Sequence, residues 1–269
     1  MSKGLGWLDV TELPIDWLYM LEKEHLKWTA AGWKDNAPRE RSLGICLNHH
    51  PTLLWYFKTF NPEDALWFQR IAEAIDEPLS AAEIRQAEVE VLNWMNDWLV
   101  YIINPQVYLD LPFTQWSEQE LTNMADFHGK RVLDIGAGPG LLTFIAAKTA
   151  RAVYAVEPVS NLRRFIRKRA VDMGYRHVYA VDGLITAIPF EDKFADLTMA
   201  GHVCGDDWEG EIEEMRRVTA PGGMIVLHPA TNDSETDQEG HTFLVNKGFR
   251  WQRFEEPEEG WKRSYWITV

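Results

Sequence analysis

The second half of the chain alternates short apolar runs with longer segments in which apolar residues recur every three or four positions. Apolar runs of about 4–8 residues are typical of buried parallel strands, and the longer spacing is typical of helices that cover a sheet. We predict five parallel strands with helices on both faces and an antiparallel pair at the C-terminus. The strands are predicted at 131–135, 152–156, 177–181, 195–200 and 224–228, and the pair at 249–255 and 265–269.

The first part of the chain shows helical spacing and no convincing strand. Ser80 and Glu83 have the spacing of a capping box, and apolar residues from Ile84 to Ile102 then predict one long helix that ends near Asn104. Further helix starts are predicted at Asn61-Pro62 and at Ser117, and another helix around 18–28.

Two prolines, Pro105 and Pro112, interrupt the pattern before the first predicted strand. We therefore place a hinge within 105–127. The predicted organisation is an N-terminal helical cap or lid, residues 1–127, followed by an α/β domain, residues 128–269.

The chain has 269 residues and a formal net charge of −14. Phosphate contacts need a basic surface, so we expect no nucleic-acid partner. The one basic run has helical spacing and is interpreted as the solvated face of a helix, with a phosphate-binding patch as the alternative. It consists of Arg163, Arg164, Arg167, Lys168 and Arg169.

Cys46 and Cys204 are the only cysteines, too few for a disulfide framework or a cysteine-rich metal site. The N-terminus lacks the apolar core of a signal peptide, and no apolar stretch reaches the length of a membrane span. We expect a soluble cytoplasmic protein with no membrane partner.

The stretch 131–140, RVLDIGAGPG, predicts a strand, a glycine loop and the start of a helix. Gly136 and Gly138 let a ligand approach the backbone closely. The dinucleotide fingerprint G-x-G-x-x-G/A needs glycine or alanine at position 141, where this chain has Leu141. Asp134 also places a carboxylate where a pyrophosphate would be repelled. A cofactor with a positively charged amino group suits the loop better, and a tight turn without a ligand is the alternative.

VLDIGAGPG resembles the first motif of class I S-adenosylmethionine-dependent methyltransferases, of the small-molecule, type 11-like group. The resemblance covers about residues 130–228, including 188–196 and 218–226, and does not reach the first 127 residues. It implies a Rossmann-like sheet and S-adenosyl-L-methionine as the cofactor. The residues it assigns to the cofactor are Asp134, Gly136, Ala137, Gly138, Glu157, Pro158, Asp182, Gly183, Leu184, Ala200 and Gly201.

Polar residues end several predicted strands, where ligands of open α/β sheets bind. Glu157 lies ~20 residues beyond the glycine loop, where an acid takes ribose hydroxyls, in dehydrogenases as well as methyltransferases. By resemblance, Asp182 accepts from the adenine amino group and the N–H of Gly183 meets a ring nitrogen. Ordinary Asp-Gly turn chemistry and a loop acid without a ligand are the alternatives.

His202, just past the fourth strand, is the candidate general base, because the unperturbed pKa of histidine lies near neutrality. A histidine that only hydrogen-bonds a loop is the competing interpretation. Cys204 is interpreted as a small buried thiol. Two groups of residues offer metal ligands: His49-His50, and His202 with Asp206 and Asp207. The rings of adjacent histidines on a helix point about 100° apart, so His49 and His50 do not easily share one ion. Acids at the start of a helix explain Asp206 and Asp207 equally well. We predict no metal.

The region before residue 127 holds nine of the thirteen tryptophans, from Trp7 to Trp116. We interpret most of them as core, with one or two rings lining the pocket. The predicted function is transfer of a methyl group to a small molecule. The alternatives are an NAD(P)-dependent oxidoreductase and a non-catalytic cofactor- or partner-binding module. The acceptor and the oligomeric state do not follow from the sequence.

Overall fold

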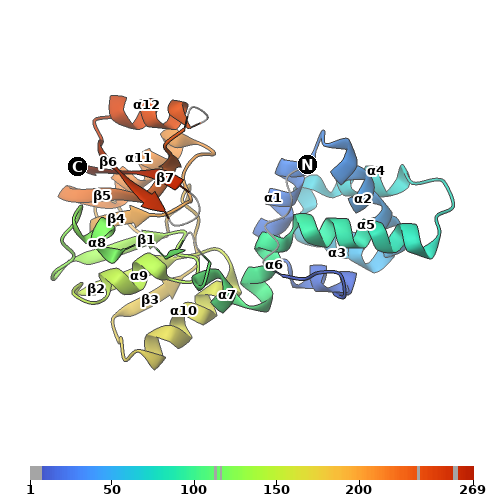
Figure 1. Ribbon diagram of the computed structural model, residues 1–269, viewed down its shortest axis with the longest axis horizontal. Helices are drawn as coiled ribbons and strands as arrows, with labels where there is room; N and C mark the ends of the chain where they lie inside the picture. The colour runs from blue at the N-terminus through green and yellow to red at the C-terminus, as the bar shows by residue number, and fades with distance from the viewer. Residues whose placement is uncertain (1–7, 112–113, 116, 235–236, 257–259) are drawn as a thin grey trace. The chain divides into compact units, whose positions relative to one another are not determined.

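The computed structural model divides the chain into two compact units, Met1–Val107 and Tyr108–Val269. It describes residues 8–111, 114–115, 117–234, 237–256 and 260–269 (Figure 1). Trp7, Pro112 and Trp116 lie outside the described residues. The division falls before the boundary that the sequence analysis placed at residue 127.

In the described part of the N-terminal unit every regular element is a helix, in agreement with the sequence pattern. The capping box at the start of α5 is present, because the Ser80 hydroxyl accepts from the N–H of Glu83 while the Glu83 carboxylate accepts from the N–H of Ser80. The elements are η1 (Ile15–Met20), α1 (Lys23–Trp33), α2 (Ala37–His49), α3 (Pro51–Phe60), η2 (Pro62–Asp64), α4 (Ala65–Glu73), α5 (Ala81–Trp94) and α6 (Asn96–Ile103).

The single long helix predicted from Ile84 to Ile102 is wrong: α5 ends at Trp94 and α6 begins at Asn96. The break has a tertiary cause. The amide of Asn96 is fully buried and pairs with the backbone of Leu8, accepting from its N–H at 3.1 Å and donating to its carbonyl at 2.8 Å. These contacts with a distant segment could not be seen in the periodicity.

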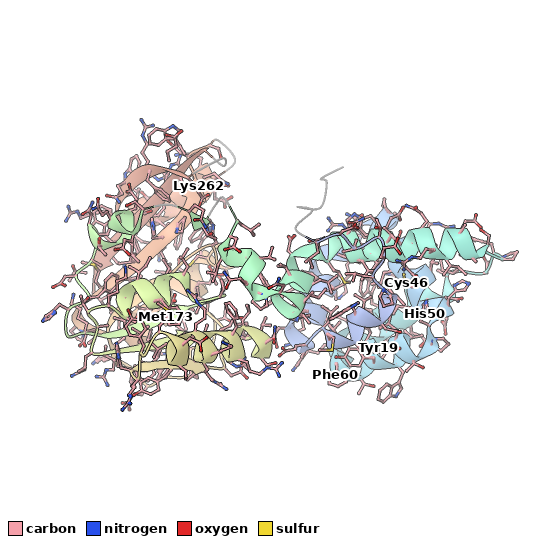
Figure 2. The ribbon with its side chains drawn as sticks, turned by 60° about the horizontal axis from the view of Figure 1, so that its bottom comes forward. Tyr19, Cys46, His50, Phe60, Met173 and Lys262 are labelled. Carbon is pink, nitrogen blue, oxygen red and sulfur yellow. The ribbon has the colours of Figure 1, made fainter. Side chains whose placement is uncertain are left out.

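The tryptophans of the helical unit are mostly core, as predicted. Trp33 and Trp67 are buried, and Trp17, Trp94 and Trp98 are half-buried against the same cluster. Trp55 is the exception, with 61% of its surface exposed. The buried side chains of this unit form one apolar core, which includes Cys46, labelled in Figure 2.

The C-terminal unit is built on a seven-stranded sheet of order β3-β2-β1-β4-β5-β7-β6. The first five strands pair in parallel, and β7 runs antiparallel to both β5 and β6, as predicted. The strands are β1 (Arg131–Ile135), β2 (Ala152–Val156), β3 (Val178–Val181), β4 (Ala195–Ala200), β5 (Thr219–Asn232), β6 (Arg250–Glu256) and β7 (Gly260–Thr268).

Alternate residues of the strands enter two different cores, because successive side chains of a strand point to opposite faces. Val132 packs in the core that includes α9 (Leu141–Ala146) and α10 (Ser160–Asp172). Leu133 packs in the core that includes α11 (Trp208–Val218) and α12 (Gln238–Asn246) (Figure 1). The sheet is therefore covered on both faces.

A short segment before β1 also belongs to this unit. It contains α8 (Glu118–Thr122), where the Ser117 hydroxyl accepts from the N–H of Gln119 as the sequence predicts. Leu121, Met124 and Phe127 pack in the same core as α9 and α10. These residues therefore stabilise the sheet domain, although the sequence analysis grouped them with the N-terminal helices. Before them, α7 (Pro105–Leu109) spans the division between the units.

Within the part of the chain that the structure describes, every helix is too short or too polar to span a bilayer.

Candidate functional site

The register of the sheet aligns the carboxyl ends of β1 to β4 with Leu227 in β5, after which the pairing of β5 with β7 becomes irregular. Ile135 pairs with Val156 and Ala200, Val156 pairs with Val181, and Ala200 pairs with Leu227. The residues that follow these ends therefore lie side by side along one edge: Gly136, Glu157, Asp182, Gly201 and His228. Sequence analysis selected the first four. The predicted fifth strand, 224–228, ends at His228, whereas β5 runs from Thr219 to Asn232.

The glycine loop after β1 has the left-handed backbone that its sequence suggests. Gly136 and Gly138 have φ of 64° and 55°. A Cβ at Gly136 would collide with Val203 in the loop after β4, so this glycine is required by packing. A Cβ at Gly138 would meet nothing within 4 Å. Gly138 thus exposes its backbone to open space, as close approach by a ligand requires.

Asp134 is a buried carboxylate beside this loop, with 1% of its surface exposed. The Thr143 hydroxyl donates to Oδ2, whereas Oδ1 is buried and accepts no hydrogen bond from any described residue. Burial raises the pKa of Asp134 to about 7. An oxygen left without a donor beside a pocket fits a ligand that brings a cationic N–H group.

Glu157 is also buried, and its two oxygens hold the surrounding backbone. Oε2 accepts from the N–H of Gly138 at 2.8 Å, and Oε1 accepts from the N–H of Val159 at 2.9 Å. Burial raises the pKa of Glu157 to about 7, against the lowering effect of these hydrogen bonds. Each carboxylate oxygen has a second lone pair, so the group has capacity for further donors.

The basic run on α10 braces the strand ends. The Arg163 guanidinium donates to the carbonyls of Glu157 and Pro158, each at 2.7 Å, and to the Asp182 carboxylate at 2.9 Å. Arg169 donates to the carbonyl of Pro139 in the glycine loop. Arg167 donates to the carbonyl of Ala180 in β3. Three side chains of the basic run therefore make hydrogen bonds to the sheet or to the loops that follow its strands. The interpretation of the run as a solvated face was wrong for Arg163 and Arg169, which are half-buried, whereas Arg167 is exposed.

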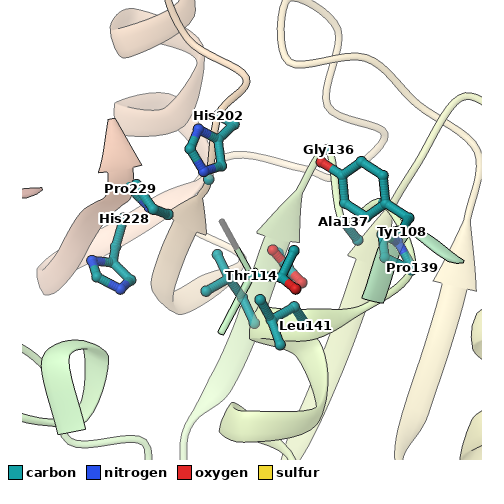
Figure 3. Close-up of a pocket in the computed structure, with 13 residues that line it drawn as sticks. Tyr108, Thr114, Gly136, Ala137, Pro139, Leu141, His202, His228 and Pro229 are labelled. Carbon is teal, nitrogen blue, oxygen red and sulfur yellow. The ribbon is translucent and has the colours of Figure 1, made fainter. Parts of the chain in front are cut away.

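A pocket brings part of the predicted set together (Figure 3). It encloses about 50 Å³. Thirteen residues line the pocket; six of them were predicted from the sequence and seven were not. The predicted ones are Asp134, Gly136, Ala137, Gly138, Gly201 and His202; the others are Tyr108, Thr114, Pro139, Leu141, Leu142, His228 and Pro229.

The remaining predicted residues lie outside this pocket. Asp182 has an exposed side chain, whereas Ala200 is buried in the core beneath the sheet. Gly183 lies against Pro189, whose ring would be 2.6 Å from a Cβ at that position. Leu184 forms an isolated bridge with Ala187. Pro158 contributes its carbonyl to Arg163.

Two imidazoles form one side of the pocket, opposite Tyr108 (Figure 3). His202 has a left-handed backbone, φ 55°, and its N–H donates to the carbonyl of Pro229 at 2.9 Å. His228 is fully buried, with Nδ1 2.6 Å from the Ser264 hydroxyl. Burial, together with the nearby His202, lowers the pKa of His228 to about 3, so this ring is neutral at physiological pH.

The other candidate groups have structural roles. Burial raises the pKa of the Cys204 thiol, which packs against the core on the α11 face but is half-buried, where the sequence analysis expected a buried thiol. His49 meets the carbonyl of Ile45 while His50 meets Glu88, so the two rings do not converge. Asp207 caps α11. Among the described residues, no three His, Cys, Asp or Glu side chains are arranged to hold a metal ion.

Comparison with known proteins agrees with this fold. Residues 133–227 match the family model of the methyltransferase domain. An uncharacterised methyltransferase of Mycobacterium sp. (strain KMS) is 37% identical over 102 residues, which cover 37% of this chain and 38% of that protein. A demethylmenaquinone methyltransferase of Anoxybacillus flavithermus is 26% identical over 116 residues, 41% of this chain and 49% of the relative.

The matches to these curated relatives thus span less than half of their length. Among solved structures, a chain from the complex of the Haloferax volcanii Trm112 methyltransferase activator with a methyltransferase superposes with a TM-score of 0.52 at 12% identity. That match covers 65% of this chain and 95% of the other, and it supports the fold. Residues 133–227 therefore form a methyltransferase domain, and the sheet unit is similar to class I S-adenosylmethionine-dependent methyltransferases.

Proposed function

We propose that the C-terminal unit binds S-adenosyl-L-methionine and transfers its methyl group to a small-molecule acceptor by in-line displacement. The observation that supports this most directly is Asp134 Oδ1, a buried acceptor without a donor among the described residues, beside a glycine that leaves open space. When bound, the cofactor supplies a methyl group activated by a sulfonium.

Different residues at the carboxyl edge of the sheet bind different parts of this cofactor. Asp134 takes the amino group, because its unfilled oxygen requires a donor. Glu157 takes the ribose hydroxyls with its remaining lone pairs. Asp182 and the backbone of Gly183 meet the adenine. The other members of the proposed set are Gly136, Ala137, Gly138, Pro158, Leu184, Ala200 and Gly201.

His202 and His228 lie on the acceptor side of the pocket. Much of what a protein adds to an in-line displacement is alignment and exclusion of water. A general base is needed where the acceptor atom carries a proton, and it then contributes about 10²–10⁴-fold. We assign this role to His202, since it lines the pocket and keeps part of its side chain exposed. The low pKa of His228 suits it to packing and hydrogen bonding.

The pocket must enlarge to hold the cofactor. Its volume of about 50 Å³ is well below the roughly 300–1,000 Å³ of ligand pockets. Tyr108 and Thr114 lie before β1 in the chain and line it from outside the sheet, so we expect them to move when the cofactor binds.

Titration calorimetry tests the cofactor assignment. We expect S-adenosylmethionine and S-adenosylhomocysteine to bind and NAD not to bind, because Asp134 opposes a pyrophosphate. Tight binding of NAD with no binding of the other two would overturn the proposal and support an oxidoreductase. Binding without methyl transfer to any acceptor of a broad small-molecule panel would support a non-catalytic binding module.

The N-terminal helices are proposed to form a cap or lid over the acceptor. The exposed ring of Trp55 supports this role, because an aromatic surface can exclude water from a reaction. Hydrogen exchange with and without S-adenosylhomocysteine tests it. We expect slower exchange in helices before residue 107 as well as at 136–140. Protection confined to the sheet unit would show that the helical unit has another role.

A further inference from the structure

Behind His202, on the side of the C-terminal strand pair, lies a buried charged group that the proposed function does not use. Glu256, the last residue of β6, has a side chain with no exposed surface. Its Oε1 is 3.5 Å from Nε2 of His202, and its Oε2 is 3.1 Å from Nζ of Lys262 on β7. Lys262, labelled in Figure 2, also donates to the side-chain carbonyl of Asn232 at 2.6 Å.

This arrangement gives the two oxygens of Glu256 different partners. A buried carboxylate is costly unless it is paired, and Lys262 provides the compensating charge. Neither oxygen meets hydrogen-bond geometry with a donor among the described residues. Lys262 is a donor only, so it fixes which oxygen remains for the imidazole. The carboxylate is thus held at a ring nitrogen of a residue that lines the pocket.

We propose that Glu256 is a positioning residue, which sets the orientation and the tautomer of His202 and is itself held by Lys262. This inference rests on the proposed role of His202. The carboxylate keeps the proton of the neutral ring on Nε2, so that Nδ1 carries the lone pair. A proton leaving the acceptor is taken by Nδ1, the ring becomes an imidazolium with protons on both nitrogens, and the Glu256 side chain still faces Nε2–H. The ring then returns one proton to water.

The distant origin of the three groups supports a shared role. His202 follows β4, whereas Glu256 and Lys262 come from the two strands of the C-terminal hairpin. The backbone of His202 is in the left-handed region, which is uncommon for a residue with a side chain, and Pro229 holds its N–H. Backbone outliers of this kind often mark functional sites. Among the described residues, Glu256 is paired with the ring of His202, Lys262 is paired with Glu256, and His202 lies near enough to His228 to lower its pKa.

The substitution Glu256→Gln gives a directed test. Lys262 can face only the amide oxygen, which turns the amide NH₂ toward His202. The amide then donates to Nε2 and shifts the ring proton to Nδ1. In a Ser-His-Asp triad the equivalent Asp-to-Asn change leaves the geometry intact and places the imidazole in the wrong tautomer.

Long-range ¹H–¹⁵N spectra of the ring, assigned with a His202→Gln variant, measure the tautomer without any acceptor. They are recorded at about pH 9, where a typical imidazole is neutral. We expect mainly the Nε2–H form in the wild type. In Glu256→Gln we expect the tautomer ratio to change at least about tenfold toward Nδ1–H. Glu255→Gln, the same change at the exposed neighbouring position, should leave the ratio unchanged.

An unchanged ratio in Glu256→Gln, in a protein whose melting temperature shows that it is folded, would overturn the proposal. So would a wild-type ring with its proton mainly on Nδ1. If Glu256→Gln does not fold, Lys262→Gln is used instead: it leaves the carboxylate without its cation, and the Nε2–H form should persist or increase. Calorimetry with S-adenosylhomocysteine is independent of this result, because Glu256 lies outside the proposed cofactor residues. A failure of the proposed function would appear there.

Discussion

The two units use buried polar side chains in different ways. In the helical unit, Asn96 is paired with both backbone groups of Leu8, and Glu88 lies between His50 and Arg85 at 2.7 and 2.8 Å. In the sheet unit, Asp134 keeps one buried oxygen without a hydrogen bond, and Glu256 keeps two, as far as the described residues provide donors.

Buried polar groups whose hydrogen bonds are made within the protein stabilise the fold, whereas buried oxygens without a hydrogen bond can bind a ligand or orient a proton-accepting side chain. A buried polar atom left unsatisfied costs about 1–3 kcal/mol, so such atoms persist where something else offsets the cost. Asp134 lines a pocket, and Glu256 lies behind His202, which lines it too. His25 Nε2 and Asn61 Oδ1 in the helical unit also have no hydrogen bond with a described residue, but neither residue lines the groove between α2 and α5. Desolvation alone keeps His25 neutral, with a pKa lowered to about 4.

The largest effect on binding is expected at Asp134. Asp134→Asn removes the charge that the cofactor amino group would meet, and charge-assisted hydrogen bonds contribute roughly 1.5–3 kcal/mol. Calorimetry should show affinity for S-adenosylmethionine weakened about 10–100-fold, with a melting temperature no lower than that of the wild type. Asp126→Asn, at an exposed position, is the matched control. Wild-type affinity in Asp134→Asn would remove this residue from the cofactor site.

A substitution of Asn96 is expected to lower stability and to leave cofactor binding unchanged. Asn96→Ala removes two buried hydrogen bonds to Leu8, so chemical denaturation should show the free energy of unfolding lowered by about 1–3 kcal/mol. Cofactor affinity at a temperature where the variant is folded should stay within about twofold of the wild type. Asn93→Ala, at an exposed position one turn earlier, should change neither quantity. A loss of affinity in Asn96→Ala alone would break the comparison between the units.

Cofactor binding and stability should respond to pH in opposite directions. Burial raises the pKa of Asp134 from 3.8 and of Glu157 from 4.5 to about 7 in the folded protein. Between about pH 4 and 7 the folded state therefore binds more protons than the unfolded state, and the free energy of unfolding falls as pH rises.

Affinity for the cationic cofactor should instead increase from about pH 6 to pH 8 as Asp134 ionises. Calorimetry in buffers of different ionisation enthalpy should detect proton release on binding near neutral pH. The increase and the proton release should both diminish in Asp134→Asn. An affinity that is flat across this range in the wild type would contradict the raised pKa.

The smallest effect is expected at Arg163. Its guanidinium joins the loops after β2 and β3, but its carboxylate partner, Asp182, is 73% exposed, and exposed pairs contribute little. We expect Arg163→Met to weaken cofactor binding about three- to tenfold through the loss of loop order. Arg164→Met, one residue along the same helix with an exposed side chain, should have no effect. Equal affinities in the two variants would show that the hydrogen bonds of Arg163 contribute to stability and not to cofactor binding.

Local patterns in the sequence predicted the features that depend on near neighbours. The alternation of strands and helices, the capping box at Ser80 and the glycine loop each reflect residues a few positions apart. Strand ends also carry information, because parallel strands share one carboxyl edge. That rule selected Glu157 and Asp182 before the register was known, although their roles toward a cofactor remain proposals.

Contacts between distant segments could not be predicted in this way. The break at Met95 depends on Leu8, the packing of 118–127 depends on the sheet, and the brace at Arg163 depends on how close α10 lies to two strand ends. Glu256 gave no local signal, since an acid at the end of an edge strand is ordinarily solvated. The sequence by itself determined the alternation of strands and helices in the sheet unit and the position of the glycine loop. The tertiary structure alone decided which polar groups are buried together, because desolvation and pairing depend on segments that meet only after the chain folds.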